Sequence, residues 1–306
     1  MLTTLLTRTD VSRHLRALHL MQTLKDALKA HLRADSAQTR RFPAPNAGGS
    51  TLIRQAILPS LPAYAVTVRS EHPSGKPVSR AVLQLHDGHT GQLLALMDAG
   101  HLMALRAAVT GAVAVDLLAP PDAAHVAVLG VGPSTSGALK ALRLVRSLER
   151  VQLYDPNMAL ATELSFKLHH ETKTPIHATE SAEEAIGGAD VVLLDGAVRL
   201  PAKGLKPGCH ISVLGAEGLL ASPLPDSLAS QARLYADAPH AAVLWAKTPI
   251  TDLGAVLAGE KPGRENAAQT TVWLSMGPAV LDLVTAWHVY EGARVDDALP
   301  RLDFES

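Results

Sequence analysis

The sequence predicts an α/β protein that contains a doubly wound parallel sheet, and three observations support this fold class. From His125 onward, short apolar segments alternate with segments of helical periodicity, as they do in proteins built from strand–helix–strand units. The first apolar segment, Val126–Gly130, ends in closely spaced glycines and continues into a helical pattern. Aromatic residues form only 3% of the 306 residues, whereas Ala and Leu are abundant, which favours a helix-rich α/β protein.

The N-terminal part of the chain follows a different pattern. Leucine and methionine at helical spacing predict one helix from Asp10 to about Arg33. The polar, Pro- and Gly-rich segment Ser36–Ser50 is typical of a loop. Apolar segments separated by turn signals then predict an antiparallel meander, with strands at Ser50–Leu58, Ala63–Ser70, Ser79–His86 and Gln92–Met97. A run with few charges, Leu102–Leu118, predicts a buried helix.

Pro120 and Pro121 end this helix and mark a domain boundary. Parallel strands are expected beyond them at Val126–Gly130, Val151–Tyr154, Val191–Leu194, His210–Leu214 and Leu234–Ala236. A last long helix is expected from Thr270 to Ala293, broken or started at Gly277-Pro278, and we expect it to return to the first domain.

The composition argues against several classes of protein. A net charge of −1 without long runs of one sign disfavours nucleic acid or an anionic membrane as the main partner. No apolar run is expected to span a membrane, and Met1–Asp10 lacks the features of a signal peptide, so we expect a cytoplasmic protein. The single cysteine, Cys209, fits a reducing compartment and is expected to be buried in a strand. The histidines show no metal-ligand spacing, and no motif indicates a hydrolase elbow or a phosphate-binding P-loop.

The glycine-rich turn predicts dinucleotide binding. Gly130 allows a sharp turn, and Gly132 lets backbone N–H groups approach a pyrophosphate at the N-terminus of the next helix. The second strand ends in Asp155, which follows Gly130 by 25 residues, near the spacing at which an acid accepts hydrogen bonds from an adenosine ribose. Thr135 stands where a third glycine would fall, so the same turn also fits a doubly wound sheet without a ligand.

Three blocks of this sequence resemble the ornithine cyclodeaminase/mu-crystallin family. They are the segment around Asp87-Gly-His-Thr-Gly91, the helix containing Leu105-Arg-Ala-Ala108, and the glycine-turn domain with its later segments 187–192 and 205–216. The resemblance implies two lobes. Residues 1–119 plus 271–306 would form an α+β substrate-binding and dimerisation domain, and residues 120–270 would form an inserted Rossmann domain.

The resemblance also implies hydride transfer between an amino-acid Cα and the nicotinamide of NAD(P). This chemistry needs a cation for the carboxylate and an acid or base for the nitrogen. Arg106 matches the family's carboxylate-binding arginine, for which a guanidinium is well suited; a salt bridge within the fold is the alternative. Arg41, or its neighbour Arg40, lies where members often place a second substrate arginine, although adjacent arginines in a polar loop are also typical of a solvated surface.

The expected substrate pocket departs from the family at two positions. Thr67 stands where members usually have a lysine, and it carries no charge. Arg69, two residues further along the strand, and Arg80 on the next strand are candidates for the missing cation, but an arginine does not shuttle protons near neutral pH. Glu217 stands where members usually have Asp. It is the candidate acid or base, with a solvated loop acid as the alternative.

The cofactor domain also has its own features. Ser134 and Thr135 replace a common Gln-Ala pair, and their hydroxyl groups could reach phosphate oxygens. Asp195 lies in a segment where members have hydroxyl residues, and an acid there disfavours phosphate unless it binds ribose hydroxyls. Together with Asp155 it favours NAD over NADP, because an acid repels a 2′-phosphate. Gly215, after a later strand, completes the expected cofactor-binding set.

These features predict an NAD-dependent oxidoreductase that acts on a small amino or imino acid as a homodimer. The altered pocket favours a reductase or dehydrogenase over ornithine cyclisation. The alternative is a family member without catalytic activity that binds a nucleotide or another small ligand.

Overall fold

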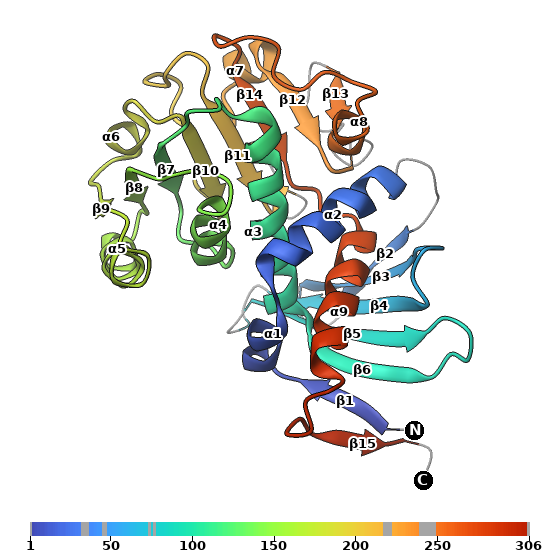
Figure 1. Ribbon diagram of the computed structural model, residues 1–306. Helices are drawn as coiled ribbons and strands as arrows, with labels where there is room; N and C mark the ends of the chain where they lie inside the picture. Colours follow the sequence, from blue (N-terminus) through green and yellow to red (C-terminus); the bar gives the residue numbers. More distant parts are fainter. Residues whose placement is uncertain are drawn as a thin grey trace. The chain divides into compact units, whose positions relative to one another are not determined.

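The computed structural model describes residues 2–31, 37–44, 48–72, 75, 78–216, 222–238 and 249–304. The chain divides into two compact units (Figure 1). Unit 1 comprises Met1–Arg106 and Pro278–Ser306, and unit 2 comprises Ala107–Gly277. The divisions expected from the sequence lie after residues 119 and 270 instead. Unit 2 holds a parallel sheet and unit 1 a largely antiparallel one, so the predicted fold class is confirmed.

Unit 1 contains a sheet whose described strands follow the order β15-β1-β6-β5-β4-β3-β2. The predicted meander is confirmed, because each strand from β2 to β6 is antiparallel to the next. The strands are β1 (Leu2–Leu6), β2 (Ala37–Ala44), β3 (Gly49–Ile57), β4 (Ala63–Glu71), β5 (Ser79–Asp87), β6 (Leu93–Asp98) and β15 (Arg301–Asp303).

The prediction of a loop over Ser36–Ser50 is wrong, because most of this segment forms β2 and the start of β3. β2 pairs with β3 from Ala37 opposite Ala56 to Ala44 opposite Gly49. An edge strand needs partners on one side only, so it tolerates a polar sequence and Pro43. Pairing with β3 therefore outweighs the local composition.

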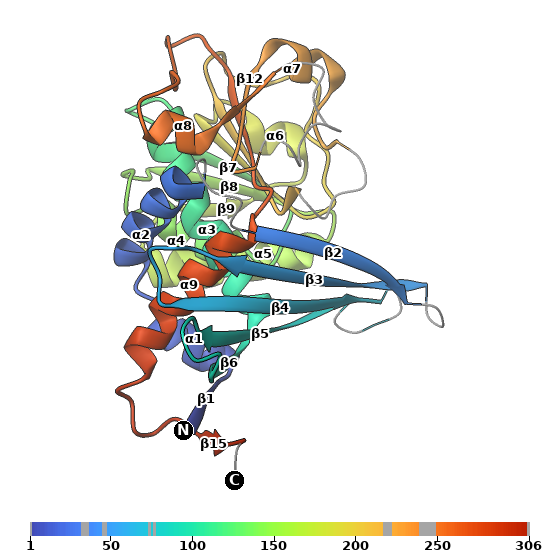
Figure 2. The same cartoon turned by 90° about the vertical axis from the view of Figure 1, so that its right-hand side faces the viewer.

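The predicted N-terminal helix is two helices, α1 (Arg8–His14) and α2 (Ala17–His31). α1 ends because Leu15 takes an extended conformation, with φ −83° and ψ 116°. α9 (Ala279–Ala293) packs against α1, α2 and one face of β2–β5 (Figure 2). Along β3 the side chains at 52, 54 and 56 are buried, and those at 53, 55 and 57 are exposed. The sheet of unit 1 therefore has an inner face under α9 and an exposed outer face.

In unit 2, the described strands form a parallel sheet in the order β13-β12-β14-β11-β10-β7-β8-β9. All five predicted strands are confirmed. The strands are β7 (His125–Leu129), β8 (Arg150–Tyr154), β9 (Ile176–Ala178), β10 (Val191–Asp195), β11 (His210–Leu214), β12 (Arg233–Ala236), β13 (Ile250–Asp252) and β14 (Thr271–Leu274). The helices are α3 (Ala99–Leu118), whose first residues belong to unit 1, α4 (Thr135–Leu142), α5 (Met158–Thr172), α6 (Ala182–Ile186), α7 (Asp226–Gln231) and α8 (Leu253–Leu257).

The start of the predicted last helix is wrong, because Thr271–Leu274 forms β14. All four residues are buried, and β14 lies between β11 and β12. A strand buried on both faces is a short continuous apolar run, which periodicity does not distinguish from a buried helix. The helix itself begins at Ala279, after Gly277-Pro278.

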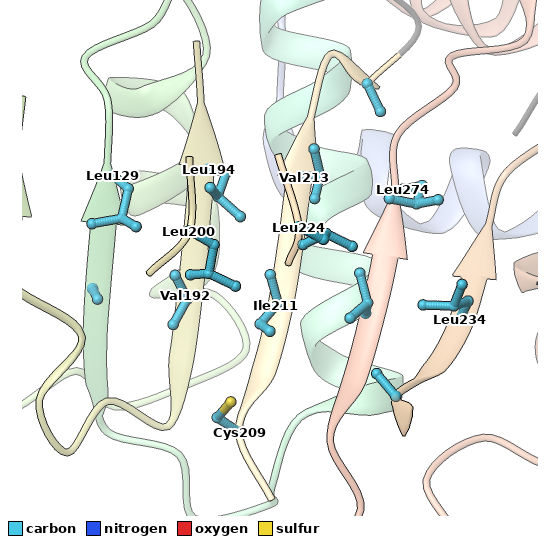
Figure 3. Close-up of a cluster of buried hydrophobic side chains, with 14 of the residues drawn as sticks. Leu129, Val192, Leu194, Leu200, Cys209, Ile211, Val213, Leu224, Leu234 and Leu274 are labelled. Atoms are coloured by element: carbon cyan, nitrogen blue, oxygen red, sulfur yellow. The ribbon is translucent and has the colours of Figure 1, made fainter. Parts of the chain in front are cut away.

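A core cluster of unit 2 lies on one face of its sheet, with side chains from β7, β10, β11, β12 and β14 and from the segments that contain Leu200 and Leu224 (Figure 3). Cys209 lies in this core immediately before β11, and burial raises the pKa of its thiol to about 11. α3 is 20 residues long, and an 18-residue window of it has a mean hydropathy of 1.5, so by length and composition alone it would be able to span a membrane. However, 78% of that window is buried inside the structure, as is usual for a core helix.

The order of the strands creates a switch point beside β7. The chain runs from β7 to β8 and β9 on one side, and then returns to β10 and β11 on the other side. In open α/β sheets, ligands bind at the carboxyl ends of the strands that flank such a point. Gly130 follows β7 and Asp195 ends β10, so both residues lie at the expected place.

Candidate functional site

The turn after β7 requires glycine for two reasons. Gly130 has φ +94°, a conformation that other residues rarely adopt. A Cβ atom at Gly130 would also overlap the backbone carbonyl of Asp195 on the neighbouring strand. The Gly130 N–H donates to the carbonyl of Tyr154 at 2.8 Å. The close approach of β7 and β10 therefore accounts for this glycine even without a ligand.

The N-terminus of α4 binds a carboxylate of the protein itself. Asp195 Oδ2 accepts hydrogen bonds from the Ser134 N–H at 2.8 Å and from Thr135 Oγ1 at 2.9 Å. The Gly132 N–H donates to Thr135 Oγ1 at 3.0 Å. Helix N-termini bind anions through such donors and through the helix dipole. Asp195 therefore occupies donors at the start of α4 that were expected to bind phosphate.

Asp195 is almost completely buried, with 4% of its surface exposed. Burial raises the pKa of its carboxyl group above the ordinary value, and the hydrogen bonds from Thr135 and Ser134 act in the opposite direction. Both effects are expected for an acid held by a helix N-terminus away from water.

Asp155 also lies against the glycine turn. Its Oδ2 accepts the Val131 N–H and its Oδ1 accepts the Asn157 N–H, both at 2.8 Å. A carboxylate has about four acceptor positions, so these bonds leave capacity for ribose hydroxyls. Gly215, after β11, has φ +65°, and a Cβ there would have no atom within 4 Å.

Unit 1 contains a buried cluster of two arginines and one aspartate. Arg106 Nε donates to Asp282 Oδ1 at 3.1 Å, and Arg54 Nη1 donates to Asp282 Oδ2 at 3.4 Å. The exposed fractions of Arg54, Arg106 and Asp282 are 6%, 2% and 1%. These three side chains together carry one net positive charge in a place with little access to water.

Arg54 is not among the candidates that the sequence motifs indicate. The signal was its position on β3, where Leu52, Arg54 and Ala56 alternate with exposed residues. An arginine on the buried face of such a strand is unusual, because a charge is costly to bury. Asp282 was missed as well, and its place in the first turn of α9 gave no comparable signal.

The strand register shows which pocket candidates lie near this cluster. Thr67 lies directly opposite Arg54 in the β3–β4 pair and is buried. The position of the family's lysine is therefore next to Arg54, on the same face of the sheet. Arg69 also faces inward, but it forms an ion pair with Glu71 at 2.6 Å and donates to Ser79 at 3.1 Å.

Arg80 does not join this group. Arg80 lies opposite Ser70, which is the neighbour of Arg69 in β4. Neighbouring side chains of a strand point to opposite faces, so Arg80 lies on the outer face, and it is exposed. Arg41 lies in β2 opposite Leu52, and its side chain is outside the described part of the structure. Glu217 lies outside the described residues. Within the described ranges, no group of three or more His, Cys, Asp or Glu side chains could hold a metal ion.

The profile of the ornithine cyclodeaminase/mu-crystallin family matches residues 1–297. The chain belongs to this family. Its relatives include the ketimine reductase mu-crystallin of Mus musculus, 32% identical over 225 residues that cover 70% of each chain. A Delta(1)-pyrroline-2-carboxylate reductase of Bacillus cereus (strain ATCC 10987 / NRS 248) is 27% identical over 284 residues, which cover 86% of this chain and 87% of the relative.

Solved structures share the fold of this family member. An archaeal alanine dehydrogenase dimer with bound NAD superposes with a TM-score of 0.89 at 24% identity, over 99% of this chain and 100% of the other. The Delta(1)-pyrroline-2-carboxylate reductase of Thermococcus litoralis, in complex with NADH and L-proline, gives a TM-score of 0.88 at 24% identity, over 98% and 100% of the two chains.

Proposed function

We propose that this protein is an NAD-dependent oxidoreductase that reduces a small imino acid, or oxidises the corresponding amino acid, by hydride transfer at Cα. The observation that carries the proposal is the buried pair Arg54 and Arg106 around Asp282. Family membership supports the same reaction, because two relatives are named as reductases of an imino acid or a ketimine.

The arginine pair suits a substrate carboxylate. Two guanidinium groups lie together in a buried place, and guanidinium groups bind the carboxylate of an α-imino acid well. Asp282 fixes the plane of the Arg106 guanidinium through Nε. A guanidinium fixed in this way binds a carboxylate with little loss of conformational freedom. Arg106 and Arg54 are therefore assigned to the substrate carboxylate in this proposal.

The residues at the switch point suit a dinucleotide, with one exception. Gly130 and Gly132 allow close approach of the backbone, and Ser134 and Thr135 offer donors at the start of α4. Asp155 would accept hydrogen bonds from the ribose and favours NAD over NADP. The exception is Asp195, which uses the donors of Ser134 and Thr135. When bound, the nicotinamide supplies or accepts the hydride.

The replacement of lysine by Thr67 favours imine reduction over ornithine cyclisation. A protonated imine already carries the proton of the product amine, so its reduction makes a small demand on a proton donor. Loss of ammonia from ornithine requires several proton transfers, and neither Thr67 nor Arg54 is suited to them. Glu217 remains the proposed acid or base, by its match to the family's aspartate.

We also propose that unit 1 forms a homodimer through the outer face of its sheet. Ile53, Val68 and Val82 form one row across β3, β4 and β5, because they lie opposite one another in register. Ile53 and Val82 are 37% and 49% exposed. Such a row on a sheet suits an apolar contact with the same face of a second copy.

A non-catalytic family member is the second candidate. Thr67 in place of the lysine and Asp195 at the phosphate donors favour it. Such a protein would bind a small carboxylate through Arg54 and Arg106 without turnover.

An assay of imine reduction tests the proposal. The purified protein is given NADH with Δ1-pyrroline-2-carboxylate, and the loss of NADH absorbance is followed. The matched control is 1-pyrroline, which has the same ring without the carboxylate. We expect turnover of the carboxylated imine only. Equal rates with both imines would contradict the role of the arginine pair. No turnover with any cyclic or linear imino acid would favour the non-catalytic candidate.

A further inference from the structure

We infer that Asp195 is an internal anion that occupies the phosphate position of the glycine turn and lowers the affinity of this protein for dinucleotides. The inference rests on the proposed dinucleotide site and adds a residue that controls access to it. It comes from three properties of Asp195: its hydrogen bonds, the space that it fills, and its charge.

The hydrogen bonds of Asp195 use the donors at the start of α4. The Ser134 N–H and Thr135 Oγ1 both donate to Oδ2, at 2.8 Å and 2.9 Å. Thr135 Oγ1 accepts the Gly132 N–H at 3.0 Å. The side chain of Ser134, which precedes α4, makes no capping hydrogen bond. The Asp195 carboxylate therefore takes the place of a bound anion in a closed network.

The side chain of Asp195 also fills the space beside Gly132. A Cβ atom built on Gly132 would overlap the Asp195 carboxylate, with Oδ2 at 2.6 Å. A glycine at this position of a Rossmann turn keeps space for the pyrophosphate. Here that space holds the carboxylate group, so a pyrophosphate and the observed Asp195 side chain exclude each other.

Charge adds to the steric conflict. Asp195 is 4% exposed, and a phosphate in contact with it would place two anions together away from water, where their repulsion is strong. Asp155 holds the Val131 N–H of the same turn and adds a second carboxylate nearby. A dinucleotide therefore binds only after the Asp195 side chain has turned away from α4.

Displacement of Asp195 is compatible with the local backbone. Asp195 is the last residue of β10, and Gly196 follows it with φ +116° and no neighbouring atom within 4 Å of a built Cβ. The phosphate would then take over the donors of Ser134 and Thr135. The observed affinity is the intrinsic affinity reduced by the fraction of molecules in which Asp195 has moved.

The test is a comparison of NADH dissociation constants. The wild-type protein, Asp195→Ala and Asp195→Asn are titrated with NADH, following tryptophan quenching and energy transfer to the nicotinamide. Asp195→Ala removes both the charge and the side-chain volume, and Asp195→Asn removes the charge alone. Asp122→Asn, an exposed acid in unit 2, is the control for the change in net charge. Circular dichroism confirms that each variant is folded.

We expect Asp195→Ala to bind NADH about tenfold or more tightly than the wild type, and Asp122→Asn to bind like the wild type. ADP, which carries the pyrophosphate, should show the same gain in competition with NADH. An unchanged or weaker affinity of Asp195→Ala, with clear binding by the wild type, would overturn the inference and leave the proposed function intact. If neither the wild type nor Asp195→Ala binds NADH or NADPH, both the inference and the cofactor assignment are overturned.

Discussion

Asp282 at the start of α9 accepts a hydrogen bond from Arg106 on α3 at 3.1 Å, and both side chains are almost completely buried. Its second oxygen accepts a hydrogen bond from Arg54 on β3. A single carboxylate thus holds two guanidinium groups from separate elements of unit 1. We expect this arrangement to fix the arginines before the substrate arrives, which reduces the entropic cost of binding.

Arg106→Lys should lower kcat/KM for the imino acid by roughly 10²-fold or more. Lysine keeps the charge but loses the planar pair of donors. Binding of NADH should not change, because Arg106 lies in unit 1. Steady-state kinetics and an NADH titration of the same preparation provide the measurements. An unchanged kcat/KM in a folded variant would eliminate the carboxylate role of Arg106.

Arg54→Gln should raise KM for the substrate by roughly tenfold or more, with a smaller effect on kcat. Glutamine retains a donor toward Asp282 but removes the second positive charge, so the loss falls on substrate binding. Arg80→Gln is the matched control, since Arg80 lies on the outer face of the same sheet. Similar kinetic effects in the two variants would show that Arg54 acts through stability or net charge alone.

The stability of unit 2 should depend on His210 at acid pH. His210 is completely buried, with Nδ1 2.9 Å from Thr271 Oγ1 and Nε2 2.9 Å from Ser212 Oγ. Thr271 Oγ1 donates its hydrogen to the carbonyl of Leu118, so Nδ1 carries the imidazole proton and Nε2 accepts from Ser212. The pKa of His210 is lowered from 6.5 to about 3, mainly because the side chain is buried and in addition because of the nearby charges of Arg264 and Arg146.

This shift sets the sign of the pH effect. The unfolded chain takes up a proton at His210 below about pH 6.5, whereas the folded protein does not until about pH 3. The contribution to stability is therefore complete above pH 6.5 and falls by about 1.4 kcal/mol per pH unit in that window. Urea unfolding across this range should show a weaker pH dependence for His210→Gln than for the wild type. Parallel curves for the two proteins would contradict the assignment.

Ile53→Asp should convert the proposed dimer to a monomer. The charge would lie at one end of the apolar row that Ile53 forms with Val68 and Val82, and burying it in an interface is unfavourable. Phe166→Asp, at a residue 68% exposed on α5 of unit 2, is the control. Sedimentation equilibrium provides the molecular mass. A dimer that persists in Ile53→Asp, or a wild-type monomer, would rule out this interface.

The sequence was sufficient where the pattern of one segment reflects its own structure. The glycine turn, the meander and the alternating strands of unit 2 were all predicted from local patterns and family motifs. The failures at β2 and β14 occur where pairing with another segment decides the outcome. β2 is a strand because β3 pairs with it, and β14 is a strand because it lies between β11 and β12.

The same limit applies to the candidate site. Arg54 donates a hydrogen bond to Asp282, which is 228 residues away in the sequence. No local pattern connects the two residues. The position of Asp195 at the end of β10 was visible in the sequence. Its contact with the first residues of α4 requires the pairing of β10 with β7, which carries the carboxylate to the glycine turn.

Transfer of a hydride to Cα is the central claim, and isotope transfer tests it most directly. The protein is incubated with Δ1-pyrroline-2-carboxylate and NADH deuterated at one face of nicotinamide C4, and the amino-acid product is analysed by mass spectrometry and NMR. The account predicts proline with deuterium at Cα from one of the two labelled faces and none from the other. A product without deuterium from either face, or no product at all, would contradict it.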